Sequence, residues 1–130
     1  MYELLRLGID EENIKYMIES NYNLEDITDE EVLERIELLK VLRLDEKKIR
    51  NILIGNPWYL DRCISDVANT VNKLIDLGIE SIGLLIYENP MLLNVDLFEV
   101  ESFIKKKQKE NYSMEDIVNM IEEDSNIITE

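Results

Sequence analysis

A short motif recurs four times along the chain at a constant step, and this repeat constrains the fold more than any other feature of the sequence. The copies are Leu7-Gly8-Ile9-Asp10, Leu42-Arg43-Leu44-Asp45, Leu77-Gly78-Ile79-Glu80 and Tyr112-Ser113-Met114-Glu115, and their first residues are 35 positions apart. A period in the mid-thirties is typical of helical repeat proteins, in which one helix-turn-helix unit is stacked on the next. The sequence therefore predicts a repeat protein.

A short helix opens each unit. Apolar residues recur there at steps of three and four, as in Ile14, Met17 and Ile18, which is the period of an amphipathic helix. A side chain that can accept a hydrogen bond stands at the start of three of these helices and is predicted to cap their free amides. These caps are Asp10, Asp45 and Ser113, with Asp116 completing a capping box behind Ser113.

A longer helix follows in each unit, and we predict it at residues 29–42, 65–77 and 96–109. Thr28 and Glu31 form a capping-box pattern at the start of the first one. An apolar stripe then follows, which consists of Val32, Leu33, Ile36 and Leu39. The stripe is predicted to face the core.

The two prolines of the chain fall at the same place in adjacent units, as Asn56-Pro57 and Asn89-Pro90. Asn21-Tyr22 and Asp124-Ser125 occupy this place in the outer copies. A residue before proline avoids the helical region, so the short helix ends here and a tight turn begins. The apolar residues that follow are predicted to pack beneath the helices, and Trp58 among them is interpreted as filling the space under its repeat.

These signals predict an all-α protein, a short curved α-solenoid of about three and a half helix-turn-helix repeats. The whole chain, residues 1–130, is expected to form one domain, because its length suits a single hydrophobic core. The units are placed at approximately 4–37, 38–72, 73–108 and 109–130.

The pattern resembles the repeat of the mitochondrial transcription termination factor (mTERF) family, over nearly the whole chain. The best matching stretch runs from Leu77-Gly78-Ile79 through Ile82, Leu85 and Ile86 to Pro90, Leu92 and Leu93, and a less complete one runs from Leu42 to Pro57 and Leu60. The resemblance implies a curved helical solenoid and, for members that bind nucleic acid, a basic inner surface.

Composition argues against several classes of function. The 29 acidic and 14 basic residues give a net charge of −15, which repels a polyphosphate backbone unless the cations are segregated. The chain has no histidine and one cysteine, Cys63, which we expect in the core, so the usual zinc sites and nucleophilic triads are excluded. We expect no enzyme activity, no cofactor, no metal site and no membrane span, and a soluble, cytoplasmic protein.

The leading hypothesis is a non-catalytic regulator or inhibitor that docks an acidic surface on a basic protein partner, one that itself handles nucleic acid. Such a surface would mimic the spaced phosphates of nucleic acid. The alternative for any one of these side chains is a solvated helix face. The candidate residues are Glu25, Asp26, Asp29, Glu30, Glu31, Glu34 and Glu37.

A second hypothesis is direct nucleic-acid binding through a local basic patch, as the family resemblance implies. Residues 38–72 carry four acidic and six basic side chains, whereas residues 1–37 carry twelve and three. The alternative is a structural role, in which cations near helix C-termini balance the helix dipole. The candidate residues are Lys40, Arg43, Lys47, Lys48, Arg50, Lys105, Lys106, Lys107 and Lys109.

Overall fold

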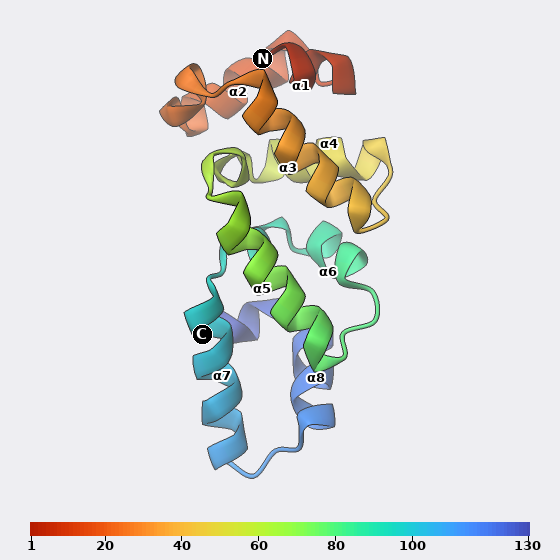
Figure 1. Cartoon of the computed structure of the whole chain (residues 1–130), viewed down its shortest axis with the longest axis vertical. Coiled ribbons are helices and arrows are strands. Elements are labelled where there is room, and N and C mark those ends of the chain that lie inside the picture. Colours follow the sequence, from red (N-terminus) through yellow and green to blue (C-terminus); the bar gives the residue numbers. More distant parts are fainter. The chain divides into compact units, whose positions relative to one another are not determined.

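The computed structural model describes residues 1–130 and is entirely helical, with eight α-helices, four 3₁₀-helices and no strand (Figure 1). The all-α expectation is therefore confirmed. The α-helices are α1 (Tyr2–Leu7), α2 (Glu11–Ser20), α3 (Asp29–Val41), α4 (Glu46–Gly55), α5 (Ile64–Leu77), α6 (Ile82–Glu88), α7 (Leu97–Lys109) and α8 (Met114–Glu123). The 3₁₀-helices are η1 (Tyr22–Asp26), η2 (Pro57–Asp61), η3 (Pro90–Asn94) and η4 (Ser125–Thr129).

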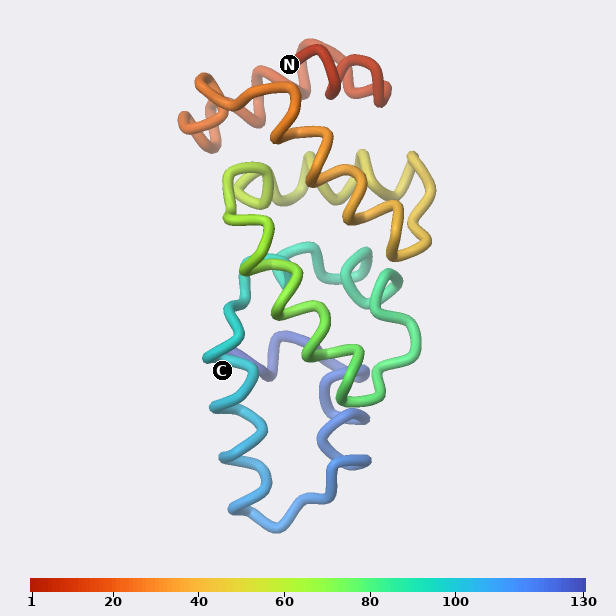
Figure 2. The backbone as a smooth tube through the Cα atoms, in the orientation of Figure 1, coloured from red at the N-terminus to blue at the C-terminus, as the bar shows by residue number.

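Contacts divide the chain into two compact units, unit 1 (Met1–Ile64) and unit 2 (Ser65–Glu130). In unit 1, elements of one kind from successive repeats contact each other: α1 with α3, α2 with α4, and η1 with η2. In unit 2, the backbone reverses after α7 and returns as α8, which contacts α7 (Figure 2). The expectation that the 130 residues behave as one domain stays a prediction.

Side-chain caps begin most of the helices, as the sequence predicts. Asp10 accepts a hydrogen bond from the Asn13 backbone N–H at 2.8 Å, and Asp45 accepts one from Lys48 at the same distance. Thr28, Asp96 and Ser113 each form a full capping box. Neither α1 nor α6, which have six and seven residues, has a side-chain cap hydrogen bond at its N-cap.

A residue in the left-handed region follows each long helix and turns the chain into the next short one. These residues are Gly8 (φ 103°), Arg43 (φ 67°), Gly78 (φ 111°) and Asn111 (φ 70°). The next residue donates a backbone hydrogen bond to the fifth residue before it, which closes the turn in all four copies. The match of Tyr112 with Leu77 was therefore wrong by two residues, because Tyr112 stands where Ile79 stands in the preceding copy.

An asparagine ends each of the first three short helices, at the place predicted from the two Asn-Pro sites. The Asn21 side-chain amide donates to the Pro57 carbonyl oxygen at 3.5 Å, and the Asn89 amide donates to Ser125 Oγ at 2.7 Å. Both partners belong to the following repeat. The side chain at this corner therefore joins neighbouring repeats as well as ending the helix.

Two predictions about this region were wrong. Tyr59 and Leu60 are fully buried, but Trp58 before them is 43% exposed, because a 3₁₀-helix has about three residues per turn and here turns Trp58 and Asp61 to solvent. The expectation that Trp58 fills the core is corrected accordingly. Cys63, expected in the core, is exposed directly before α5, where the chain leaves η2.

The left-handed turn generates a stability prediction. Gly78→Ala should lower the free energy of unfolding by about 1 kcal/mol, since a Cβ there meets no atom within 4 Å and only backbone strain is added. Arg43→Gly should raise it by roughly 0.5 kcal/mol, because relief of strain exceeds the added entropy of the unfolded chain. Urea unfolding measures both changes.

The control is Gly55→Ala at the end of α4, where φ is not positive and alanine favours the helix. This variant should be neutral or more stable. Equal losses at Gly78 and Gly55 would contradict a conformational cause.

Candidate functional site

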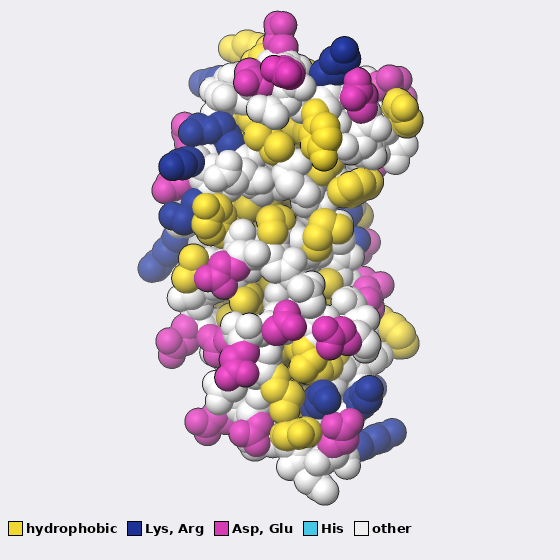
Figure 3. All heavy atoms as spheres, turned by 180° about the vertical axis from the view of Figure 1, so that it is seen from behind, with side chains coloured by type: hydrophobic (Ala, Val, Ile, Leu, Met, Phe, Trp, Pro, Cys, Tyr) yellow, Lys and Arg dark blue, Asp and Glu magenta, His cyan; other side chains and the backbone are white.

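The acidic candidates lie in η1, in α3 and in the link between them. Glu31 is half-buried and the other six are exposed: Glu25, Asp26, Asp29, Glu30, Glu34 and Glu37. Figure 3 views the chain from behind Figure 1 and shows acidic, basic and apolar side chains exposed together on that face. The structure therefore presents most of the predicted acidic residues to solvent, within a single unit.

Two of these carboxylates hold the fold together. Glu31 accepts from the Thr28 hydroxyl at 3.0 Å and from its backbone N–H at 3.4 Å, which completes the capping box. Asp29 accepts from the Glu3 backbone N–H and from the Met1 amino group, each at 3.2 Å, and so ties α1 to α3. The Glu3 hydrogen bond is the main reason why the pKa of Asp29 is lowered.

The other five carboxylates are available to a partner. Glu37 lies 3.8 Å from Lys40, and a solvent-exposed ion pair of this kind contributes little. Glu34 is exposed but lies 3.5 Å from the buried guanidinium of Arg35. Glu25, Asp26 and Glu30 make no hydrogen bond or ion pair, so they are the least constrained members of the set.

An exposed apolar strip accompanies the glutamates on α3. Leu33, predicted to face the core, is 40% exposed, and Val41 is 75% exposed. With Leu38 and Ile64 they line a depression of about 430 Å³, whose remaining walls are Glu30, Glu34 and Glu37. The sequence analysis missed this depression. One signal was present: Val41 is an apolar residue in the helical register of the three glutamates.

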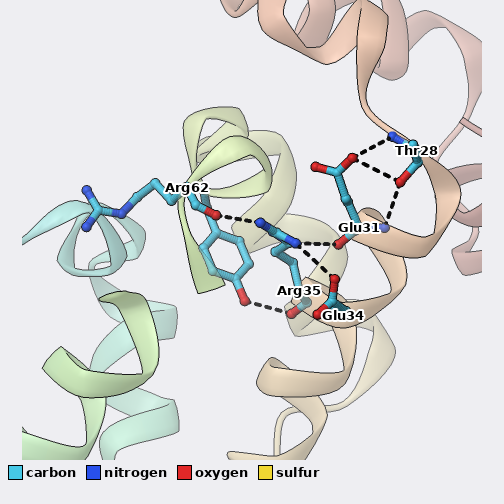
Figure 4. A network of polar contacts seen from close by, with 6 residues as sticks. Thr28, Glu31, Glu34, Arg35 and Arg62 are labelled. Atoms are coloured by element: carbon cyan, nitrogen blue, oxygen red, sulfur yellow. Dashed lines mark hydrogen bonds and ion pairs between the residues drawn. The ribbon is translucent and has the colours of Figure 1, made fainter. Parts of the chain in front are cut away.

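A buried arginine holds this part of α3 against η2 and the start of α5. Arg35 Nη2 donates to the Arg62 carbonyl oxygen at 2.6 Å and Nη1 donates to the Glu31 carbonyl oxygen at 3.2 Å (Figure 4). The Tyr59 hydroxyl donates to the Arg35 carbonyl oxygen at 2.7 Å. Burial raises the pKa of Tyr59, so this hydroxyl keeps its proton. Arg35 was not singled out in the sequence.

The basic candidates of unit 1 divide into exposed and structural residues. Lys40, Arg43 and Lys47 are exposed near the turn between α3 and α4. Lys48 is half-buried and lies 3.6 Å from Asp45. Arg50 is half-buried and donates to the Leu7 carbonyl oxygen at 3.1 Å, so its role is to join α4 to the end of α1.

The basic candidates of unit 2 lie on α7. Lys105, Lys106 and Lys109 are exposed, whereas Lys107 is half-buried, pairs with Glu110 at 3.3 Å and lies over two aromatic rings. Phe98 on the same helix is 76% exposed. Phe98, Lys106 and Lys107 line a depression of about 500 Å³ together with residues 127–130.

Neither a metal site nor a membrane-spanning helix is present. No three or more cysteine and carboxylate side chains gather closely enough to hold a metal ion. No helix combines the length and the apolar character needed to cross a bilayer.

Comparison with known proteins gives one result. A family model described as mTERF matches residues 2–129, which is nearly the whole chain. A search of curated proteins gives no match.

The lowered pKa of Asp29 generates a pH prediction. Its contribution to stability is present above the unfolded pKa, near 3.8, and is lost as the pH falls through the lower folded value. Asp29→Asn should therefore be less stable than the wild type near neutral pH, and the difference should shrink in acid. Urea midpoints between about pH 7 and pH 3 measure this.

Asp26→Asn is the matched control, since Asp26 is exposed and has no partner. Its stability should follow that of the wild type at every pH. A constant Asp29→Asn deficit down to pH 3 would show that the carboxylate charge is not the cause.

Proposed function

Because this chain belongs to the mTERF family, whose members are generally non-enzymatic nucleic-acid-binding repeat proteins, we propose that it is a non-catalytic binding module. Within that role, the acidic surface of unit 1, defined as Glu25, Asp26, Glu30, Glu34 and Glu37, docks on a basic surface of a partner protein. The protein acts as a regulator or inhibitor of that partner.

One observation supports this proposal: five exposed carboxylates lie on η1 and α3, none of them caps a helix, and only Glu34 contacts a buried side chain, that of Arg35. The net charge of −15 adds a long-range attraction to cationic surfaces and opposes direct contact with phosphates. Spaced carboxylates on a helix present negative charges to the same basic grooves that accept nucleic acid. The proposed partner is therefore a protein that handles nucleic acid, and the cytoplasm is the proposed location.

A second candidate function is direct nucleic-acid binding, which the family favours. The supporting observation is on α7, where exposed Phe98 lies on the same helix as exposed Lys105, Lys106 and Lys109. Lysines that contact phosphates beside an aromatic ring that stacks on a base are typical of single-strand binding. The basic residues of unit 1 form a separate group around Arg43.

The first prediction concerns the acidic surface. The triple variant Glu30→Lys, Glu34→Lys and Glu37→Lys should lose partner proteins that the wild type captures from host lysate, with affinity lowered about tenfold or more, because three attractive charges become repulsive. Glu31 stays unchanged, since its loss would remove a cap. Capture should weaken between low and physiological salt.

The matched control reverses Glu11, Glu12 and Glu19, which are exposed on α2 of the same unit and change the net charge by the same amount. Its captured proteins should be those of the wild type. If both variants lose the captured proteins equally, the effect comes from net charge alone. If the triple variant captures the same proteins as the wild type, the acidic surface is not the binding site.

The second prediction separates the two functions. Fluorescence anisotropy with single-stranded and double-stranded DNA and RNA at about 50 mM salt should give no binding if the acidic surface is the functional one. If nucleic acid binds, replacing Lys105, Lys106 and Lys109 by alanine should reduce the slope of log K against log salt by about 2. An unchanged slope would exclude contacts by these lysines.

A further inference from the structure

The depression on α3 forms a shallow and open groove, and it lies on a helix whose backbone is held in place. Both ends of its helix are fixed, by the Thr28 capping box and by the left-handed turn at Arg43. Ile64, which closes the groove, comes two residues after Arg62, whose carbonyl oxygen binds the buried Arg35 guanidinium at 2.6 Å (Figure 4). A partner would therefore meet this surface without ordering it first.

The fold does not require an apolar strip at this place. Glu30, Glu34, Glu37 and Val41 follow one another at helical steps along the outward side of α3. The corresponding residues of α5, counted from the start of the helix, are polar: Ser65, Asn69, Asn72 and Asp76. Those of α7 are Phe98, Ser102, Lys105 and Lys109. Only α3 combines carboxylates with aliphatic side chains along this line, so the combination reflects a binding role and not the repeat.

The dimensions of the strip suit one short helix. From Leu33 to Val41 the distance along α3 is about 12 Å, at a rise of about 1.5 Å per residue, which is a little over two helical turns. A helix lying along α3 with apolar residues at i, i+4 and i+7 places them over Leu33, Leu38 and Val41. An added β-strand is excluded, because an intact helix offers no unpaired backbone edge.

The charges that line the groove restrict which partner helix can bind there. By helical periodicity the glutamates at positions 30, 34 and 37 lie between Leu33 and Leu38 around α3, on the same line as Val41, so cations beside the apolar residues of an incoming helix would meet carboxylates. An acidic helix, a nucleic acid or an anionic lipid surface would meet repulsion from the same three side chains.

We propose that the α3 groove, lined by Leu33, Leu38, Val41, Ile64 and the three glutamates, binds a basic amphipathic helix of a partner protein. This inference rests on the proposed function and specifies the structural class of its partner. The apolar residues provide the closely packed contact. The glutamates determine the sign of the charge that the partner must carry, and they increase its rate of association.

The test uses the full chain and a fluorescein-labelled synthetic helix of about 15 residues, with leucines at i, i+4, i+7 and i+11 and lysines on both sides of them. A scrambled peptide has the same composition with the leucines distributed around the helix. A third peptide keeps the leucines and replaces lysine by glutamate. Anisotropy titration should give micromolar binding of the first peptide, about tenfold weaker binding of the scrambled one and none of the acidic one.

Variants locate the binding site. Leu33→Ser combined with Val41→Ser should weaken binding of the amphipathic peptide by about tenfold. Both side chains are exposed, so the double variant should fold, and circular dichroism checks this. Phe98→Ser is the matched control, because Phe98 is as exposed as Val41 but lies on α7 of unit 2, and it should bind as the wild type does.

The outcomes distinguish the groove from the broader function. Equal binding of the amphipathic and scrambled peptides, or an unaffected Leu33→Ser, Val41→Ser variant, would overturn the groove while leaving an electrostatic acidic surface in place. Absence of any peptide binding would also overturn it. A third outcome combines two results: the variant with Glu30, Glu34 and Glu37 changed to lysine no longer captures proteins from lysate, and the Leu33→Ser, Val41→Ser variant still binds the peptide. The partner would then bind elsewhere on the acidic surface.

Discussion

A guanidinium group buried in the middle of unit 1 is the interaction on which the arrangement of that unit depends. A buried cation is costly unless it is paired, and Arg35 donates to the Glu31 and Arg62 carbonyl oxygens and lies 3.5 Å from the Glu34 carboxylate, while its Nε has no partner. The Tyr59 hydroxyl returns a hydrogen bond to the backbone of Arg35 itself. Arg35 thus joins α3 to the segment from Tyr59 to Arg62, which lies far away in sequence, and these contacts fix the surface that the two segments form.

The repeats share their interior and differ in their exterior. Caps at the helix starts, left-handed turns at the helix ends and the corner asparagines recur in successive copies. The outward line of the long helices changes from acidic on α3 to neutral on α5 and basic on α7. In a repeat architecture the residues on this line need not form the core or cap a helix, because residues at other positions do so. Specificity can therefore change from copy to copy without a change of fold.

Local rules predicted the local features, and tertiary contacts decided the rest. The capping box of Thr28 and Glu31 lies within four residues, so sequence was sufficient to find it. The depression that Leu33 lines also contains Ile64, which is far away in sequence, and helical periodicity carries no information about such a neighbour. Tyr112 was placed two residues out of step because the segment from Gly78 to Asn89 is two residues shorter than the segment from Arg43 to Asn56, which breaks a strict period. Among the acidic candidates, sequence could not separate Glu31, which caps a helix, from Glu30, whose carboxylate has no partner in the structure.

The exposed position of Trp58 has an optical consequence. It is the single tryptophan of the chain, it lies in η2 of unit 1, and its neighbour Tyr59 is fully buried. Unit 2 contains tyrosines but no tryptophan. Fluorescence excited selectively at the indole therefore observes unit 1 alone, so the native protein carries an intrinsic reporter that separates the behaviour of its two halves without any label.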